Sequence, residues 1–150
     1  MEMVKFISHN LEETQKIADD FVHSFPQGES LGATVVGLYG ELGAGKTTLA
    51  QMIAKTLGIS DIITSPTFVI EKIYELTNQR FTHFIHIDAY RIEKSEELIH
   101  LGWKEIISDP HNLILIEWPE RVSDIMPLRH VKINLKTLEN EKSRQIEIVI

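Results

Sequence analysis

Apolar residues recur at intervals of three and four between residues 11 and 25, which is the spacing of one face of an α-helix. The residues on that face are Ile17, Ala18, Phe21, Val22 and Phe25. Asn10, followed by Glu13 three positions later, has the pattern of a capping box, and Pro26 is expected to end the helix. Before this helix, residues 3–7 alternate weakly and predict a short strand.

A buried strand, a glycine-containing loop and a second helix follow. Residues 34–39 are mostly apolar and predict the strand, and residues 46–57 predict the helix, which Gly58 should terminate. Residues 95–102 predict a short helix that opens at Ser-Glu-Glu and closes at a glycine. Residues 113–116 are wholly apolar, which predicts a short buried strand.

Two regions predict pairs of strands. Residues 68–76 and 81–87 are rich in β-forming residues and are separated by a polar tetrapeptide. They could form an antiparallel hairpin, although the second run could equally enter a parallel sheet. The segments 131–135 and 145–150 predict another hairpin across a polar turn. The simplest assembly of all these elements is an α/β fold with three layers, in which a mostly parallel sheet carries antiparallel edge strands.

Composition narrows the classes of protein that this chain could represent. With 150 residues, of which 43% are apolar, the chain can bury one sizeable core but is too short for two ordinary domains, so we expect a single domain over residues 1–150. The net charge of −7 argues against direct binding of a long phosphate backbone, which requires clustered Lys and Arg. The absence of cysteine excludes disulfides and thiolate metal sites.

The sequence also bears on location. No apolar run approaches the roughly 20 residues that a membrane span requires, and the first residues lack the apolar core of a signal peptide. We therefore expect a cytoplasmic protein that does not contact a membrane.

The loop between the first buried strand and its helix carries the clearest chemical signal. Residues 40–47 read Gly-Glu-Leu-Gly-Ala-Gly-Lys-Thr, which matches the phosphate-binding pattern G-x-x-x-x-G-K-[ST] in its required strand–loop–helix context. Glycines let backbone N–H groups wrap a phosphate, Lys46 adds a full positive charge, and Thr47 offers a hydroxyl to Mg²⁺. No [NT]-K-x-D element of the kind that reads guanine is present, so ATP is favoured over GTP.

Hydrolysis or phosphoryl transfer also needs an acid at a neighbouring strand end, either to hold Mg²⁺ or to orient the attacking water. Asp88 and Glu117 each follow a predicted strand, and the carboxyl ends of strands are where open α/β sheets bind ligands. The alternative for each is a structural ion pair, with Arg91 for Asp88 and with Arg121 for Glu117. Chemistry alone leaves open which acid would hold the metal and which would position the water.

Other polar and aromatic residues give weaker signals. Ser65-Pro66-Thr67 could form a loop that senses the γ-phosphate through a hydroxyl, but an ordinary proline turn entering a strand is as plausible. The seven histidines show no ligand spacing on a common face; His83 and His86, for example, point to opposite faces of a strand. We therefore expect no metal-binding histidine. Trp103 and Trp118 are more typical of packing than of base stacking, although Trp118, next to Glu117, would lie close to a bound nucleotide.

Taken together, these motifs resemble one family closely, the bacterial TsaE (YjeE) ATPases of tRNA threonylcarbamoyladenosine modification. The resemblance covers about residues 10–120 in unbroken order. Its motifs are Gly40-Glu41-Leu42-Gly43-Ala44-Gly45-Lys46-Thr47-Thr48, Ser65-Pro66-Thr67, His86-Ile87-Asp88-Ala89-Tyr90-Arg91, Glu96-Glu97-Leu98 and Ile116-Glu117-Trp118-Pro119-Glu120. The phosphate loop is widespread, whereas Asp-x-Tyr-Arg followed by Glu-Trp-Pro is specific. Ser95 and Ala89 stand where the family usually has Pro and Leu, and after about residue 125 the resemblance is weak.

The resemblance implies a P-loop NTPase sheet and roles for individual residues. It implies that Thr47 and Glu117 hold Mg²⁺, that Asp88 and Lys46 serve catalysis, and that Thr14 approaches the adenine. It further implies that the nucleotide phosphates lie on the loop. The loop residues concerned are Glu41, Leu42, Gly43, Ala44, Gly45, Lys46, Thr47 and Thr48.

The resemblance also implies partners. Members work with TsaD and TsaB, which transfer the threonylcarbamoyl group to adenosine 37 of tRNAs reading ANN codons, and ATP hydrolysis resets that machinery. The implied activity is a slow ATPase that reaches tRNA only through its partners. The acidic charge balance agrees with this expectation.

Two other classes compete with this reading. A small-metabolite kinase would share the phosphate loop, but it would also need a substrate pocket and an Arg-bearing lid that keeps water out. The chain has only five arginines and no insertion long enough for a separate lid, which argues against a kinase. The other class is a nucleotide-dependent interaction module in which hydrolysis is incidental.

Overall fold

The computed structural model describes residues 2–25, 31–60, 70–140 and 142–150. Its elements in chain order are β1 (Met3–Ser8), α1 (Leu11–His23), β2 (Thr34–Tyr39), α2 (Lys46–Thr56), β3 (Glu71–Glu75), β4 (His83–Asp88), α3 (Glu96–Ile99), α4 (Trp103–Ser108), β5 (Asn112–Glu117), the 3₁₀-helix η1 (Pro119–Val122), β6 (Val131–Thr137) and β7 (Arg144–Val149).

The described strands form one seven-stranded sheet in the order β1-β7-β6-β2-β5-β4-β3. The central strands β6, β2, β5 and β4 pair in parallel, whereas β1, β7 and β3 join antiparallel at the two edges. The predicted α/β fold, a parallel sheet with antiparallel edges, is thereby confirmed. In this arrangement β2 lies between β5 and β6, so the loop that follows β2 emerges beside the carboxyl end of β5.

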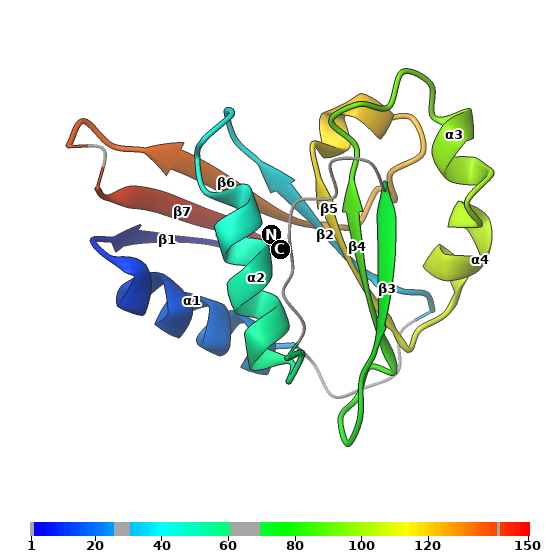
Figure 1. The fold of residues 1–150 in the computed structure, drawn as a ribbon, viewed down its shortest axis with the longest axis horizontal. Coiled ribbons are helices and arrows are strands. Elements are labelled where there is room, and N and C mark those ends of the chain that lie inside the picture. The colour runs from blue at the N-terminus through cyan, green and yellow to red at the C-terminus, as the bar shows by residue number, and fades with distance from the viewer. Residues whose placement is uncertain (1, 26–30, 61–69, 141) are drawn as a thin grey trace.

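Helices cover both faces of the sheet: α1 and α2 lie on one face, and α3 and α4 on the other (Figure 1). The side chains of β5 alternate between the two apolar cores. Leu113 and Leu115 pack with α1 and α2, whereas Ile114 and Ile116 pack in the core that includes Trp103 of α4. The wholly apolar run in β5 is therefore explained by burial on both faces.

For residues 68–87 the sequence left open an antiparallel hairpin or a strand in the parallel sheet, and the structure contains both. β3 and β4 form an antiparallel hairpin, and β4 also pairs in parallel with β5. The start of the first predicted run, at residues 68 and 69, lies outside the described residues. The second predicted hairpin is also present, as β6 and β7, and β7 in turn pairs with β1.

Local capping explains where the helices begin and end. The Asn10 side chain accepts a hydrogen bond from the Glu13 backbone N–H at 2.8 Å, and the Glu13 carboxylate accepts from the His9 N–H at 2.6 Å, so the predicted capping role of Asn10 is confirmed. This first helix, α1, ends at His23, before the expected end at residue 25. Gly58, with φ of +89°, follows α2 as expected.

The helix predicted over residues 95–102 is present as the shorter α3, and a second short helix, α4, follows it outside the predicted range. α3 ends at Ile99, and Gly102, with φ of +90°, precedes α4. The sequence analysis missed α4 because six residues are too few to show a helical period. In the described part of the chain, no helix has the length and apolar character that crossing a membrane requires.

Candidate functional site

The phosphate-loop motif lies between the end of β2 at Tyr39 and the start of α2 at Lys46. Gly43 and Gly45 have φ of +83° and +101°, a left-handed backbone that glycine adopts without strain. The Ala44 N–H donates to the Glu41 carbonyl at 3.0 Å, which closes a turn in the loop. The loop thus curls over the N-terminus of α2, where unpaired N–H groups and the helix dipole favour an anion.

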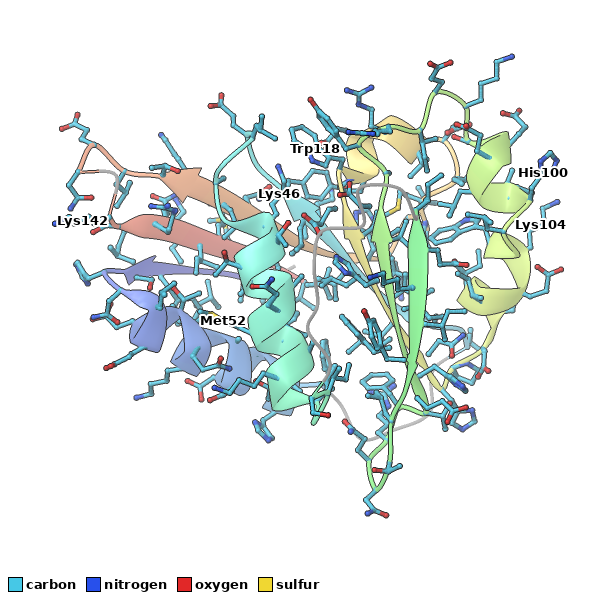
Figure 2. All side chains as sticks on the ribbon, viewed as in Figure 1. Lys46, Met52, His100, Lys104, Trp118 and Lys142 are labelled. Atoms are coloured by element: carbon cyan, nitrogen blue, oxygen red, sulfur yellow. The ribbon has the colours of Figure 1, made fainter. Side chains whose placement is uncertain are left out.

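Lys46, the first residue of α2, is only 5% exposed. Its ammonium donates to the carbonyls of Gly40 and Glu41, and it lies 3.5 Å from the centroid of the Trp118 ring (Figure 2). Burial lowers the pKa of Lys46, and the nearby carboxylates of Glu120, Glu117 and Asp88 oppose that shift. A buried cation is therefore held at the point where the motif predicts a phosphate.

Glu117 is the last residue of β5 and is 2% exposed. Its Oε1 accepts a hydrogen bond from the Thr47 hydroxyl at 2.9 Å, and its Oε2 lies 2.7 Å from Nε2 of His86. The two predicted magnesium ligands, Thr47 and Glu117, are thus in direct contact. A hydroxyl and a carboxylate fit Mg²⁺, which prefers oxygen ligands and takes its remaining positions from phosphates and water. Within the described residues, no group of three or more His, Cys, Asp or Glu could hold a metal by itself.

Asp88 ends β4 directly beside Glu117, which is its partner in the parallel register. Its Oδ1 accepts from the Tyr90 N–H at 3.0 Å, and the next residue, Ala89, donates its N–H to the Glu117 carbonyl at 2.9 Å. The two strand-end carboxylates therefore flank the loop as the sequence analysis expected. Their separate roles stay predictions.

Two cavities meet over the phosphate loop. One, of about 340 Å³, is lined among others by Lys46, Thr47, Asp88, Glu117 and Trp118. The other, of about 640 Å³, lies between the end of β1, the start of α1 and the start of β7. Both are of a size that small-molecule sites have. The two share lining residues, so together they suit an elongated ligand with an anionic end.

The remaining predicted site residues can be placed by the cavity that each one lines. Thr14, whose hydroxyl is 2.6 Å from that of Ser8, lines the larger cavity, away from the two carboxylates. Gly45 and Thr48 line both cavities, and Gly43 lines the smaller. Leu42, also on the smaller cavity, is 76% exposed. Ala44 lines the larger cavity, and Ser65-Pro66-Thr67 lies outside the described residues.

Sequence reasoning missed two residues of this site. His86 was set aside with the other histidines, although its position two residues before Asp88 places both side chains on the same face of β4. Arg144, at the start of β7, lines both cavities, and its Nε would stand 3.8 Å from a Cβ added to Gly45. No local signal marks Arg144, because only the order of the strands brings β7 to the loop.

Comparison with known proteins identifies the family. The family model described as "Threonylcarbamoyl adenosine biosynthesis protein TsaE" matches residues 8–146. The chain belongs to the TsaE family. This match continues well past residue 125, where the motif resemblance fades, and it includes β6 and the first half of β7.

Individual TsaE relatives agree. A protein of Nostoc sp., named tRNA threonylcarbamoyladenosine biosynthesis protein TsaE, is 42% identical over 125 residues, which are 81% of this chain and 74% of the relative. A Bacillus subtilis protein of the same name is 35% identical over 91% of this chain and 79% of its own length. The crystal structure of Bacillus subtilis YdiB aligns with a TM-score of 0.75 at 28% identity, covering 98% of this chain and 84% of that one. The P-loop nucleotide-binding fold is thereby confirmed.

The geometry of the TsaE loop predicts unequal costs for two glycine substitutions. In Gly40→Ala the new Cβ would stand 2.7 Å from the Leu135 carbonyl oxygen, so the backbone of β6 must move. In Gly43→Ala nothing lies within 4 Å, and only the left-handed backbone is strained. We expect Gly43→Ala to lower the free energy of unfolding by about 1 kcal/mol and Gly40→Ala by about 2–3 kcal/mol, as measured by urea unfolding. Equal losses would show that β6 relaxes at no cost.

Proposed function

We propose that this TsaE-family protein binds ATP with Mg²⁺ on the loop of residues 40–47 and hydrolyses the ATP slowly. The observation that carries the proposal is the contact between Thr47 on the loop and Glu117 on β5, which joins the predicted metal ligands beside the buried ammonium of Lys46. A glycine turn without a ligand would have no reason to bury a lysine and a glutamate at one point, since both charges lose their hydration there.

Each of these residues then has a role in hydrolysis. Loop N–H groups and Lys46 bind the β- and γ-phosphates, and Thr47 and Glu117 hold the magnesium ion, which neutralises charge on the phosphate oxygens. Asp88 lies at the neighbouring strand end, where its carboxylate can orient the attacking water. The larger cavity, with Thr14 on its wall, takes the adenosine part of the nucleotide.

The biological setting that we propose rests on the relatives. They are named as proteins of tRNA threonylcarbamoyladenosine biosynthesis, so we infer that this chain acts in making that nucleoside at position 37 of tRNAs reading ANN codons. We infer that it acts in the cytoplasm with TsaD and TsaB. The net charge of −7 favours a protein that leaves the tRNA to its partners.

A nucleotide titration tests the site. Lys46→Ala should weaken ATP binding about 10- to 150-fold, because a hydrogen bond to a charged group contributes about 1.5–3 kcal/mol. Lys55→Ala is the matched control, since Lys55 is an exposed lysine in the last turn of the same helix. Circular dichroism should show both variants folded. Wild-type affinity in folded Lys46→Ala would rule out the phosphate-loop assignment.

Substitutions of the two carboxylates should affect different properties, nucleotide binding in one case and turnover in the other. Glu117→Ala should lose the Mg²⁺-dependent part of nucleotide affinity, because it removes a metal ligand. Asp88→Ala should bind Mg·ATP nearly normally and fail in turnover, because it acts on the water. Binding measured with and without EDTA, beside steady-state phosphate release, distinguishes them. Reversed phenotypes would exchange the two roles and leave the site itself in place.

Partner dependence tests the proposed setting. The isolated protein should hydrolyse ATP slowly, and addition of TsaD and TsaB should change the rate, because partners can complete or restrain the γ-phosphate site. An arginine supplied to that site is worth about 10³–10⁵ in rate. A rate indifferent to both partners, together with phosphoryl transfer to a small metabolite, would establish the kinase instead. Indifference without transfer would contradict the proposed partnership.

A further inference from the structure

A buried histidine stands behind the Glu117 carboxylate. His86, on β4, is 0% exposed, and its Nε2 lies 2.7 Å from Oε2 of Glu117. The other carboxylate oxygen, Oε1, accepts from the Thr47 hydroxyl. Each of the two oxygens thus has its own partner, one inside the sheet layer and one on the phosphate loop.

The chemistry of the contact fixes which atom donates. A carboxylate that binds a divalent cation is ionised and can only accept, so with a cation bound the proton in this hydrogen bond belongs to His86 Nε2. The other ring nitrogen, Nδ1, is buried and has no hydrogen-bond partner among the described residues. The hydrogen bonding of this ring is therefore directed at Glu117.

The sheet register and a neighbouring aromatic ring restrict the position of the imidazole. The parallel register sets His86 opposite Leu115 and sets Asp88 opposite Glu117, so the imidazole reaches diagonally to the carboxylate on the face that packs against α2. The Phe84 ring lies parallel to the imidazole within 17°, with centroids 6.3 Å apart. A side chain buried in this way has few accessible rotamers, so the imidazole can hold the Glu117 carboxylate in one orientation.

We propose that His86 is a positioning residue, which fixes the Glu117 carboxylate with Oε1 directed at the Thr47 hydroxyl and so prepares the site for a divalent cation bound with nucleotide. The inference rests on the proposed function. It assigns His86 no ligand role, because Nε2 donates to the carboxylate and has no free electron pair for a metal, and because Nδ1, which has one, is buried. Partners of this kind that stand behind a metal ligand commonly account for 10- to 100-fold in metal affinity.

The rival explanation is that His86 only fills the core. Two substitutions separate the explanations. His86→Leu keeps an apolar side chain in the core and removes the donor, whereas His86→Gln can place an amide N–H close to the position of Nε2. His83→Leu is the matched control, because His83 lies on the same strand, three residues earlier and on the opposite face, with its Nδ1 3.0 Å from the Thr82 hydroxyl.

The experiment measures Mn²⁺ binding in the presence of ADP by electron paramagnetic resonance, and ADP binding in EDTA by calorimetry. We expect His86→Leu to weaken Mn²⁺ binding about 10- to 100-fold, with ADP affinity in EDTA unchanged. His86→Gln should recover most of the Mn²⁺ affinity, and His83→Leu should match the wild type. A variant that only loosened the core would alter both measurements together and would not be rescued by glutamine.

Three outcomes would overturn the inference, and they differ from failure of the proposed function. Wild-type Mn²⁺ affinity in His86→Leu would show that Glu117 needs no positioning. Equal losses in the Leu and Gln variants would show that the hydrogen bond is irrelevant. Should His86→Leu not fold, His86→Asn replaces it, since its shorter amide cannot reach Oε2, and equal Mn²⁺ affinity for Asn and Gln would also reject the role. If the wild type itself bound no ADP, the proposed function would fail first.

Discussion

Burying a carboxylate at the carboxyl end of β5 constrains everything around it. Glu117 is 2% exposed, and an isolated charge there would cost several kcal/mol unless other groups replaced its hydration. Two elements supply these groups: Thr47 from the first turn of α2 and His86 from β4. Because both must be in position at once, the phosphate loop is tied to the sheet.

The residue after Glu117, Trp118, contacts the positive charge of the site, the ammonium of Lys46. Trp118 has a left-handed backbone, with φ of +60°, which turns the chain sharply into η1 and places the indole against the Lys46 ammonium. The ring of Tyr90, two residues after the end of β4, has its centroid 5.0 Å from that of the same indole. One short turn thus organises the anionic and the cationic halves of the site. A cation on the face of an indole is stabilised even where water is scarce.

Local patterns predicted the parts of this site that depend on local sequence. The glycine loop, its flanking elements and the two strand-end acids all follow from residues close together in the chain. The contact of His86 with Glu117 does not, because a period of two gives the face of β4 but not its register against β5. The position of Arg144 is harder still to predict, because the strand order β1-β7-β6-β2 must be known before β7 can be placed beside the loop.

The two cavities are walled by different parts of the sheet. The smaller one is walled by the ends of central parallel strands, whose residues are buried on both faces and tolerate little change. The larger one is walled by elements at the sheet edge, the end of β1 and the start of β7, where strands and loops accept substitution more readily. The motif resemblance is dense from the phosphate loop to Glu120 and weak after about residue 125. The cavity beside the phosphate loop is therefore fixed by the central strands, whereas the larger cavity depends on how the edge elements β1 and β7 are placed.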